Sequence, residues 1–217
     1  MRKKDFNGQR TEAWDEYRKQ RATSSNFKKI ITAKRLDLSA TASKYASEIA
    51  AAKLMVGEDD VDNSFVGNDH TDRGNAREPD AIADYEYRND LEVEQVDFVI
   101  PDYTDEFGAS PDALVGEDGL LEVKCPVAAI QIARLRTPNV VPSEYTAQIQ
   151  GQLFVTGRKW CDFLSYHPET QPLQIRVYPD AEFQAALAEH MVTFLKMVKE
   201  FTELVEVKKI KEVIYAG

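Results

Sequence analysis

The segment 110–124 constrains the fold of this chain more than any other part of the sequence. It reads Ser-Pro-Asp-Ala-Leu-Val-Gly-Glu-Asp-Gly-Leu-Leu-Glu-Val-Lys, so a short apolar run, a glycine-flanked turn and a second apolar run follow one another. This order predicts a β-hairpin with one strand over 113–115 and a return strand over 120–125.

The return strand places opposite charges side by side. Because side chains alternate across a strand, Leu121 and Val123 point to one face, while Glu122 and Lys124 point to the other. The hairpin can also carry Asp112 near Glu122. Two carboxylates beside a cation form a site for a hard divalent metal ion and a phosphate ester.

A simpler interpretation is that Glu122 and Lys124 belong to the solvated face of a half-buried sheet, as such pairs usually do. The neighbouring residues favour a functional site instead. A Pro-Asp pair at 111–112 stands ten residues upstream of Glu122, and Pro126 closes the strand.

This arrangement resembles the P-D…(D/E)-x-K signature of a large nuclease superfamily. The longer string through Pro126 resembles the active-site block of phage lambda-type exonucleases, also called viral recombinase or alkaline exonucleases. Three further blocks agree with that family in order and approximate spacing: Trp-Asp-Glu-Tyr-Arg leading into Thr-Ser-Ser over 14–25, Arg-Gly-Asn-Ala-Arg-Glu-Pro-Asp-Ala over 73–81, and Tyr-Thr-Ala-Gln-Ile-Gln over 145–150.

The order of predicted elements indicates an α/β fold in which a central mixed β-sheet is flanked by helices. The resemblance implies a restriction-endonuclease-like PD-(D/E)xK core. At 217 residues and 43% hydrophobic, the chain has enough apolar material for one domain over 1–217. We expect a strand over 91–101, further strands over 160–166 and 173–178, and helices over 39–56, 72–87, 127–135 and 142–155. Pro79 allows the second of these helices to begin near Glu78.

The C-terminal region predicts one long helix starting at Asp180. Apolar residues recur there every three or four positions, which is typical of a helix with a buried stripe. The members of the stripe are Phe183, Leu187, Met191, Phe194, Val198, Phe201 and Val205.

Charge is distributed unevenly along the chain. The formal net charge is −10, yet residues 1–35 contain eleven Lys or Arg and four acidic residues. Residues 57–122 are the reverse, with Arg73, Arg77 and Arg88 as their basic residues. We therefore expect a basic N-terminal arm over 1–35 that contributes phosphate contacts and a localised DNA site. A solvated basic segment without a ligand is the alternative.

Several protein classes do not fit the sequence. Polar residues follow Arg2 at the N-terminus, so we expect no signal peptide, and no apolar stretch is long enough to span a membrane. Cys125 and Cys161 are too few and too far apart for a zinc or iron–sulfur site. We expect a cytoplasmic protein with no membrane partner, encoded by a phage or prophage in a bacterial host cell.

The resemblance implies two-metal phosphodiester hydrolysis with Mg²⁺, for which Mn²⁺ can substitute. Asp112 would bridge the two ions, Glu122 and the Val123 carbonyl would bind one of them, and Glu78 would reach one directly or through water. Lys124 would position or deprotonate the attacking water, and the sequence leaves both roles open.

The resemblance also implies a pocket for a 5′-phosphate. Arg18 is the main candidate, because a guanidinium group binds phosphate in a bidentate fork. The other candidates are Ser25, Ser110 and Gln150. Gln148 could equally supply the amide, and Ser25 could instead cap a helix. Arg35 falls where the family has a DNA-contacting arginine.

The leading hypothesis is a Mg²⁺-dependent exonuclease that enters the ends of double-stranded DNA and degrades the 5′-phosphorylated strand from 5′ to 3′. It would release mononucleotides and leave a 3′ single-stranded tail for recombination by single-strand annealing. The resemblance therefore implies a single-strand annealing protein as partner and a homotrimer. The alternatives are a structure- or site-specific endonuclease of the same fold and a catalytically inactive DNA-end-binding protein.

Overall fold

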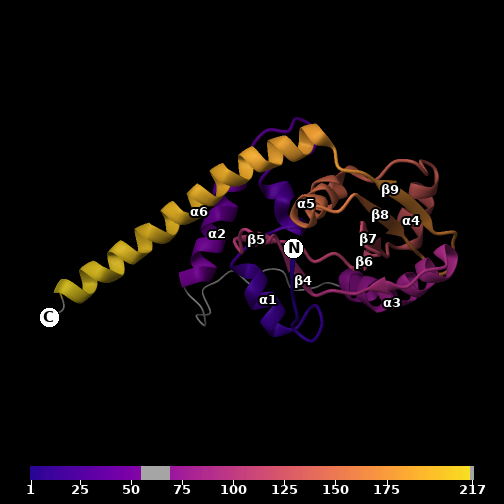
Figure 1. Cartoon of the computed structure of the whole chain (residues 1–217), viewed down its shortest axis with the longest axis horizontal. Helices are drawn as coiled ribbons and strands as arrows, with labels where there is room; N and C mark the ends of the chain where they lie inside the picture. The colour runs from indigo at the N-terminus through magenta and orange to yellow at the C-terminus, as the bar shows by residue number, and fades with distance from the viewer. Residues whose placement is uncertain (55–68, 216–217) are drawn as a thin grey trace.

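The computed structural model describes the backbone of residues 1–54 and 69–215 and the side chains of 1–54 and 73–204. Its centre is a five-stranded sheet in the order β3-β6-β7-β8-β9 (Figure 1). The bounds are β3 Val93–Glu94, β6 Ala113–Val115, β7 Gly119–Lys124, β8 Trp160–Ser165 and β9 Leu173–Val177.

The sheet is mixed, as the sequence predicts. β7 and β8 are parallel and the other neighbours are antiparallel. A parallel pair needs a long crossover connection, which is provided here by α4 (Ala128–Leu135), η2 (Ser143–Tyr145) and α5 (Thr146–Thr156). In the part of the chain that is described, no helix is both long and apolar enough to cross a membrane.

The predicted hairpin is β6 and β7, joined by a tight turn. Gly116 lies in the left-handed region at φ 53°, where glycine carries no side-chain penalty. Gly119 is also required by packing, because a Cβ there would come within 2.2 Å of the Trp160 ring. Local sequence therefore determines both the turn and the start of the return strand.

The two faces of β7 pack against different helices (Figure 1). Leu121 and Val123 belong to a buried cluster with residues of α3 (Asp69–Asn89), including Tyr85. Leu120 belongs to the larger core, which contains residues of α5. Glu122 is 1% exposed, so the interpretation of a solvated charged face is wrong.

The C-terminal helix forms as predicted. α6 spans Ala181–Tyr215 and packs against α2 (Ala42–Leu54) before extending past the rest of the described fold (Figure 1). Asp180 caps its start by accepting from the backbone N–H groups of Glu182 and Phe183. The buried stripe is confirmed from Phe183 to Val198, and Val205 lies outside the described side chains.

Two of the predicted boundaries are wrong. The predicted strand over 91–101 is divided between β3 in the main sheet and β4 (Phe98–Ile100), because β4 pairs with β1 (Arg2–Lys4) instead. α2 begins three residues later than expected. The helix expected over 72–87 is confirmed as α3, which does not begin near Glu78 but continues through Pro79, a residue without an N–H to donate to the carbonyl of Asn75.

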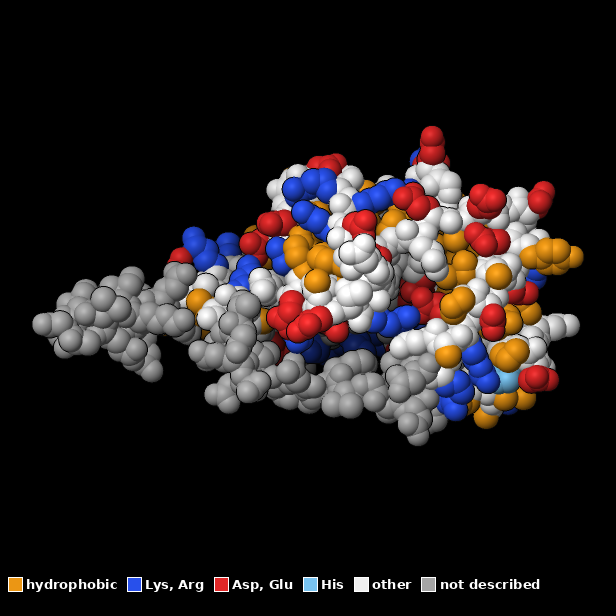
Figure 2. Space-filling view, turned by 90° about the horizontal axis from the view of Figure 1, so that it is seen from below, with side chains coloured by type: hydrophobic (Ala, Val, Ile, Leu, Met, Phe, Trp, Pro, Cys, Tyr) orange, Lys and Arg blue, Asp and Glu red, His pale blue; other side chains and the backbone are white. Residues whose placement is uncertain are grey.

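The segment 1–35 is part of the folded body. After β1 come α1 (Glu12–Lys19), β2 (Ala22–Thr23) and η1 (Ser24–Lys29), and β2 runs parallel to β5 (Phe107–Gly108). Many of its basic side chains are ion-paired, with partners that include Glu94 for Lys3, Glu78 for Arg10, Glu16 for Lys19, Asp105 for Arg21 and Glu48 for Lys29. Basic and acidic side chains are accordingly interspersed on the face drawn in Figure 2.

A buried aspartate connects three elements around the sheet. Asp162 on β8 is fully buried and accepts from Arg176 on β9 at 2.8 and 2.9 Å. It also accepts from the Tyr85 hydroxyl on α3 at 2.8 Å and from Gln174 at 3.1 Å. The carboxylate therefore holds one edge of the sheet against α3.

We predict that Asp162→Ala lowers the free energy of unfolding by about 3–5 kcal/mol, because it leaves Arg176 and the Tyr85 hydroxyl without their acceptor. Urea denaturation measures the change. Asp84→Ala, which removes an i,i+4 pair with Arg88, is the matched control and should cost less than about 1 kcal/mol. Equal losses in the two variants would contradict this account.

Candidate active site

Glu122 is the most firmly held side chain of the predicted site. Its carboxylate accepts from Lys124 Nζ, from Gln148 Nε2 at 2.6 Å and from Gln152 Nε2. The two glutamines lie four residues apart on α5 and share one face of that helix. A buried carboxylate is thus fixed in one orientation by three donors.

Asp112 is brought beside Glu122 by the hairpin. Its backbone N–H donates to the Leu121 carbonyl at 3.1 Å, and its Oδ2 accepts from the Val123 backbone N–H. Burial and the nearby charge of Glu122 raise the pKa of Asp112 well above its usual value. The predicted proximity of the two carboxylates is therefore confirmed.

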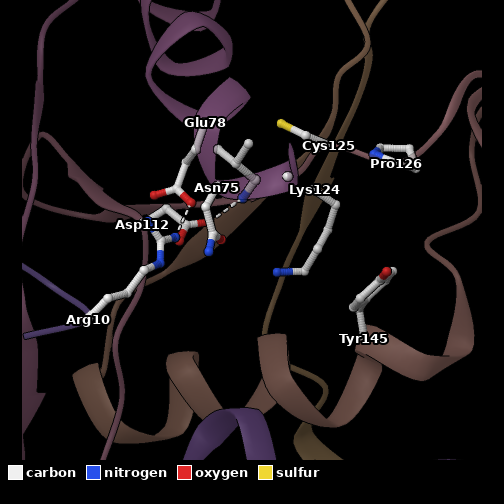
Figure 3. A pocket seen from close by; sticks show the side chains of 10 residues that line it. Arg10, Asn75, Glu78, Asp112, Lys124, Cys125, Pro126 and Tyr145 are labelled. Carbon is white, nitrogen blue, oxygen red and sulfur yellow. Dashed lines mark hydrogen bonds and ion pairs between the residues drawn. The ribbon is translucent and has the colours of Figure 1, made fainter. Parts of the chain in front are cut away.

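Glu78 reaches the same place from α3, where it forms an ion pair with Arg10. Both side chains project into a cavity of about 350 Å³, shown in Figure 3. Its lining is Arg10, Gly74, Asn75, Glu78, Asp112, Val123, Lys124, Cys125, Pro126 and Tyr145. The family resemblance predicts that Glu78 lies near Asp112 and Lys124. In the structure all three residues line one cavity.

The cavity combines negative and positive groups. Asp112 and Glu78 line it, Glu122 lies buried beneath Lys124, and Arg10 and Lys124 supply positive charge. Burial lowers the pKa of Lys124, but the charges of Glu122 and Asp112 outweigh burial and raise it above its ordinary value. In this arrangement Lys124 is an ammonium group that donates to Glu122.

The oxygen donors suit a hard divalent cation. Asp112, Glu122 and Glu78 offer carboxylates, and Val123 lines the cavity, where its carbonyl is the predicted fourth donor. Within the described ranges, no three His, Cys, Asp or Glu side chains already form a metal-binding group. The pairing of Glu78 with Arg10 and of Glu122 with Lys124 occupies oxygens that a cation would need.

Two of the predicted phosphate-binding residues, Arg18 and Ser25, contact each other. The Arg18 guanidinium stacks on Trp14, 3.8 Å from the ring centroid, and donates to Ser25 Oγ at 3.0 Å. Burial lowers the pKa of Arg18. Among the described side chains, Arg18 Nε and Ser110 Oγ are buried polar atoms without a hydrogen-bond partner. Both atoms are hydrogen-bond donors that an anion or a water molecule would satisfy.

Ser25 and Ser110, which are far apart in the sequence, each follow a strand of the same two-stranded ladder. Thr23 is paired with Gly108 in the parallel β2–β5 ladder. Ser25 and Ser110 each follow their strand by two residues, so they leave the ladder at the same end. Both serines therefore follow directly on the same end of this ladder.

Two predicted residues are not at the site. Gln150 donates to the Tyr178 carbonyl at 2.9 Å and accepts from the Asp180 N–H at 3.0 Å, so it anchors the start of α6. Residues two apart on a helix point in nearly opposite directions, and the amide that faces Glu122 is therefore Gln148. Arg35 is 80% exposed, pairs with Asp37 and does not line the cavity.

Sequence reasoning missed Arg10, Gln152 and Tyr145. The i,i+4 spacing of Gln148 and Gln152 is a signal that could have identified the correct face of α5. Tyr145 lines the cavity and packs against Phe163 with tilted rings, whose centroids are 5.4 Å apart. Arg10 carries no comparable signal, because its position depends on contacts distant in the sequence.

The raised pKa of Asp112 leads to a prediction about stability in EDTA. The unfolded chain releases this proton at a lower pH than the folded chain, so the wild-type protein loses stability as pH rises above the ordinary range of aspartate. Asp112→Asn removes this loss. We compare the urea midpoints of the variant and the wild type at pH 5 and pH 8. The midpoint of Asp112→Asn relative to that of the wild type should be higher at pH 8 than at pH 5. An exposed charge removal on the same hairpin, Glu117→Gln, is the control. A gain that is equal at both pH values would argue against the raised pKa.

Comparisons with known proteins agree with this geometry. The YqaJ-like viral recombinase domain matches residues 13–159. An alkaline exonuclease from Laribacter hongkongensis, LHK-Exo, is 31% identical with a TM-score of 0.79, and the match covers 93% of this chain and 99% of that one. The same figures hold for LHK-Exo in complex with dAMP.

A phage-related exonuclease from Haemophilus somnus 129PT shares the fold at 16% identity and a TM-score of 0.60, over 87% of this chain and 96% of that one. No curated protein matches the sequence. The family match covers well over half of the chain, and membership in this family indicates a nuclease. The chain belongs to the YqaJ-like viral recombinase family, whose structural relatives here are alkaline exonucleases.

Proposed function

We propose that this protein is a Mg²⁺-dependent double-stranded DNA exonuclease. It degrades the 5′-phosphorylated strand from 5′ to 3′ and leaves a 3′ single-stranded tail. The observation that carries the proposal is the convergence of Asp112, Glu78 and Lys124 on one cavity, with Glu122 fixed beneath it. The exonuclease titles of the similar structures support the reaction class.

In this proposal, Asp112, Glu122, Glu78 and the Val123 carbonyl hold the Mg²⁺ ions. When bound, the ions supply charge neutralisation at the phosphate and activation of water. The carboxylate of Glu122 keeps its orientation because Gln148 and Gln152 donate to it from α5. Fixed donors of this kind lower the cost of assembling a charged site.

Lys124 contributes a positive charge and hydrogen-bond donors at the cavity wall. As an ammonium group it would orient water or a phosphate oxygen. Divalent cations bound to Glu122 and Asp112 would neutralise the charges that raise the pKa of Lys124, so the proposal keeps both the orienting and the proton-accepting role for this side chain.

Arg18, Ser25 and Ser110 would bind the 5′-terminal phosphate, and Gln148 replaces Gln150 as the amide nearest the carboxylates. The unpartnered Arg18 Nε and Ser110 Oγ support this assignment. A phosphate would accept from both groups and compensate for their burial. A terminal phosphate held there would place the first phosphodiester bond of the strand toward the acidic cavity.

The product tail suits recombination by single-strand annealing, so the proposed partner is a single-strand annealing protein. A homotrimer is the proposed assembly. On the face drawn in Figure 2, side chains of both charges are interspersed, so this face offers no continuous basic surface to DNA.

Digestion of a linear duplex and a closed circle tests the function directly. We predict that Mg²⁺ and Mn²⁺ support release of nucleotides from the linear duplex, that EDTA abolishes it, and that the circle remains intact. Labels placed separately at each end report the direction. Cleavage of the circle would indicate an endonuclease instead. An inactive end-binding protein would show binding without release, and Asp112→Ala would leave that binding unchanged.

A second prediction concerns the terminal phosphate. Ends with a 5′-phosphate should be degraded faster than ends with a 5′-hydroxyl, and Arg18→Ala should reduce that preference by about tenfold or more. Arg18→Lys retains the positive charge but lacks the bidentate geometry of the guanidinium group. It should therefore keep only part of the wild-type preference for a 5′-phosphate. Initial rates on the two substrates measure the ratio. Equal wild-type rates would remove the case for Arg18.

A further inference from the structure

The turn before α1 has an unusual backbone. Asn7, Gly8 and Arg10 all have positive φ, at 59°, 116° and 70°. Left-handed conformations are uncommon for residues other than glycine and persist only where surrounding contacts hold them. Asn7 and Gly8 adopt this region readily, whereas Arg10 takes a conformation that its residue type does not favour.

Contacts with a distant segment hold this turn in place. Asp97 accepts from the N–H groups of Phe6 at 2.6 Å and Gly8 at 3.0 Å. The Gln9 side chain donates to the Val96 carbonyl at 2.8 Å and to the Pro111 carbonyl at 3.1 Å. Pro111 immediately precedes Asp112, so the turn is tied to the backbone of the acidic site itself.

The result of this anchoring is the placement of Arg10. Its side chain enters the cavity beside Asp112 and pairs with Glu78 (Figure 3). Arg10 and Lys124 are the cations that line the cavity in the described part of the chain. The Arg10 side chain is 43% exposed and that of Glu78 is 19% exposed, so the guanidinium can still reach a ligand in the cavity.

We propose that Arg10 is an exchangeable counter-ion of the active site. It neutralises Glu78 in the pair described here, and it transfers to a phosphate of the DNA backbone when a divalent cation binds Glu78. This inference rests on the proposed function. It assigns to Arg10 the recognition of a backbone phosphate in the acidic cavity, separate from the terminal-phosphate group around Arg18.

The chemistry of Glu78 supports the exchange. A carboxylate paired with a guanidinium cannot give the same oxygens to a divalent cation, so the two compete. A guanidinium released from Glu78 remains positive, because it does not lose its proton in a protein. A phosphate entering the same cavity is the anion that its planar fork matches.

Binding of Mn²⁺ without DNA tests the competition, and isothermal titration calorimetry measures it. Arg10→Gln should bind Mn²⁺ several-fold more tightly than the wild type, since Glu78 no longer has a competing partner. Arg136→Gln, an exposed arginine of the same charge that does not line the cavity, is the matched control and should leave the affinity unchanged. Arg10→Lys should lie between the wild type and Arg10→Gln.

Binding of DNA tests the transfer. Fluorescence anisotropy with a 5′-phosphorylated duplex and Ca²⁺, which we use as a non-cleaving cation, should show several-fold weaker binding by Arg10→Gln. In EDTA the variant should lose less DNA affinity relative to the wild type. Without a divalent cation, Arg10 of the wild type stays paired with Glu78 and does not contact the DNA. Cleavage in Mg²⁺ should be slower in the same variant although its metal affinity is higher.

The combination of tighter metal binding and weaker DNA binding distinguishes exchange from simple damage, because a merely disordered turn would weaken both. Unchanged or weaker Mn²⁺ binding in Arg10→Gln would overturn the proposal. So would tighter Mn²⁺ binding with unaltered DNA binding. If the wild-type protein cleaves no DNA, the proposed function fails, while the Mn²⁺ and anisotropy measurements still decide the role of Arg10.

Discussion

The mutual repulsion of carboxylates gathered at one end of a hairpin governs the rest of this structure. Asp112 and Glu122 are brought together by the backbone of β6 and β7, and Glu78 adds a third negative group from α3. Burying like charges is costly unless each finds a partner. The surrounding fold supplies those partners: Lys124 and two glutamines for Glu122, a backbone N–H for Asp112, and Arg10 for Glu78.

Each partner comes from a different part of the chain, which explains the architecture. α5 is placed against β7 by the crossover between β7 and β8, and that packing carries Gln148 and Gln152 to Glu122. The N-terminal segment is folded against β4, which carries Arg10 to the cavity. The predicted basic arm is therefore a structural part of the site, and most of its charge is used within the fold.

The features predicted correctly from sequence are those that local patterns determine. The alternation of side chains in the return strand and the glycine turn predict the hairpin. The same alternation places Glu122 and Leu121 on opposite faces of the strand. The stripe from Phe183 to Val198 likewise follows from helical periodicity alone. Features that depend on distant contacts were missed. The strand expected over 91–101 is divided because its second part pairs with β1. The prediction that Gln150 faces the site is wrong because the rotation of α5 about its axis depends on the elements packed against it. The position of Arg10 depends on Gln9 contacts that span 87 and 102 residues.

The account depends on the acidic cavity being a binding site for divalent cations. Anomalous scattering from crystals soaked in Mn²⁺ tests this most directly. The account predicts peaks within coordination distance of the carboxylates of Asp112, Glu122 and Glu78, with the Arg10 side chain displaced from Glu78. Crystals without an anomalous peak at those carboxylates, at Mn²⁺ concentrations that fill other sites, would contradict it.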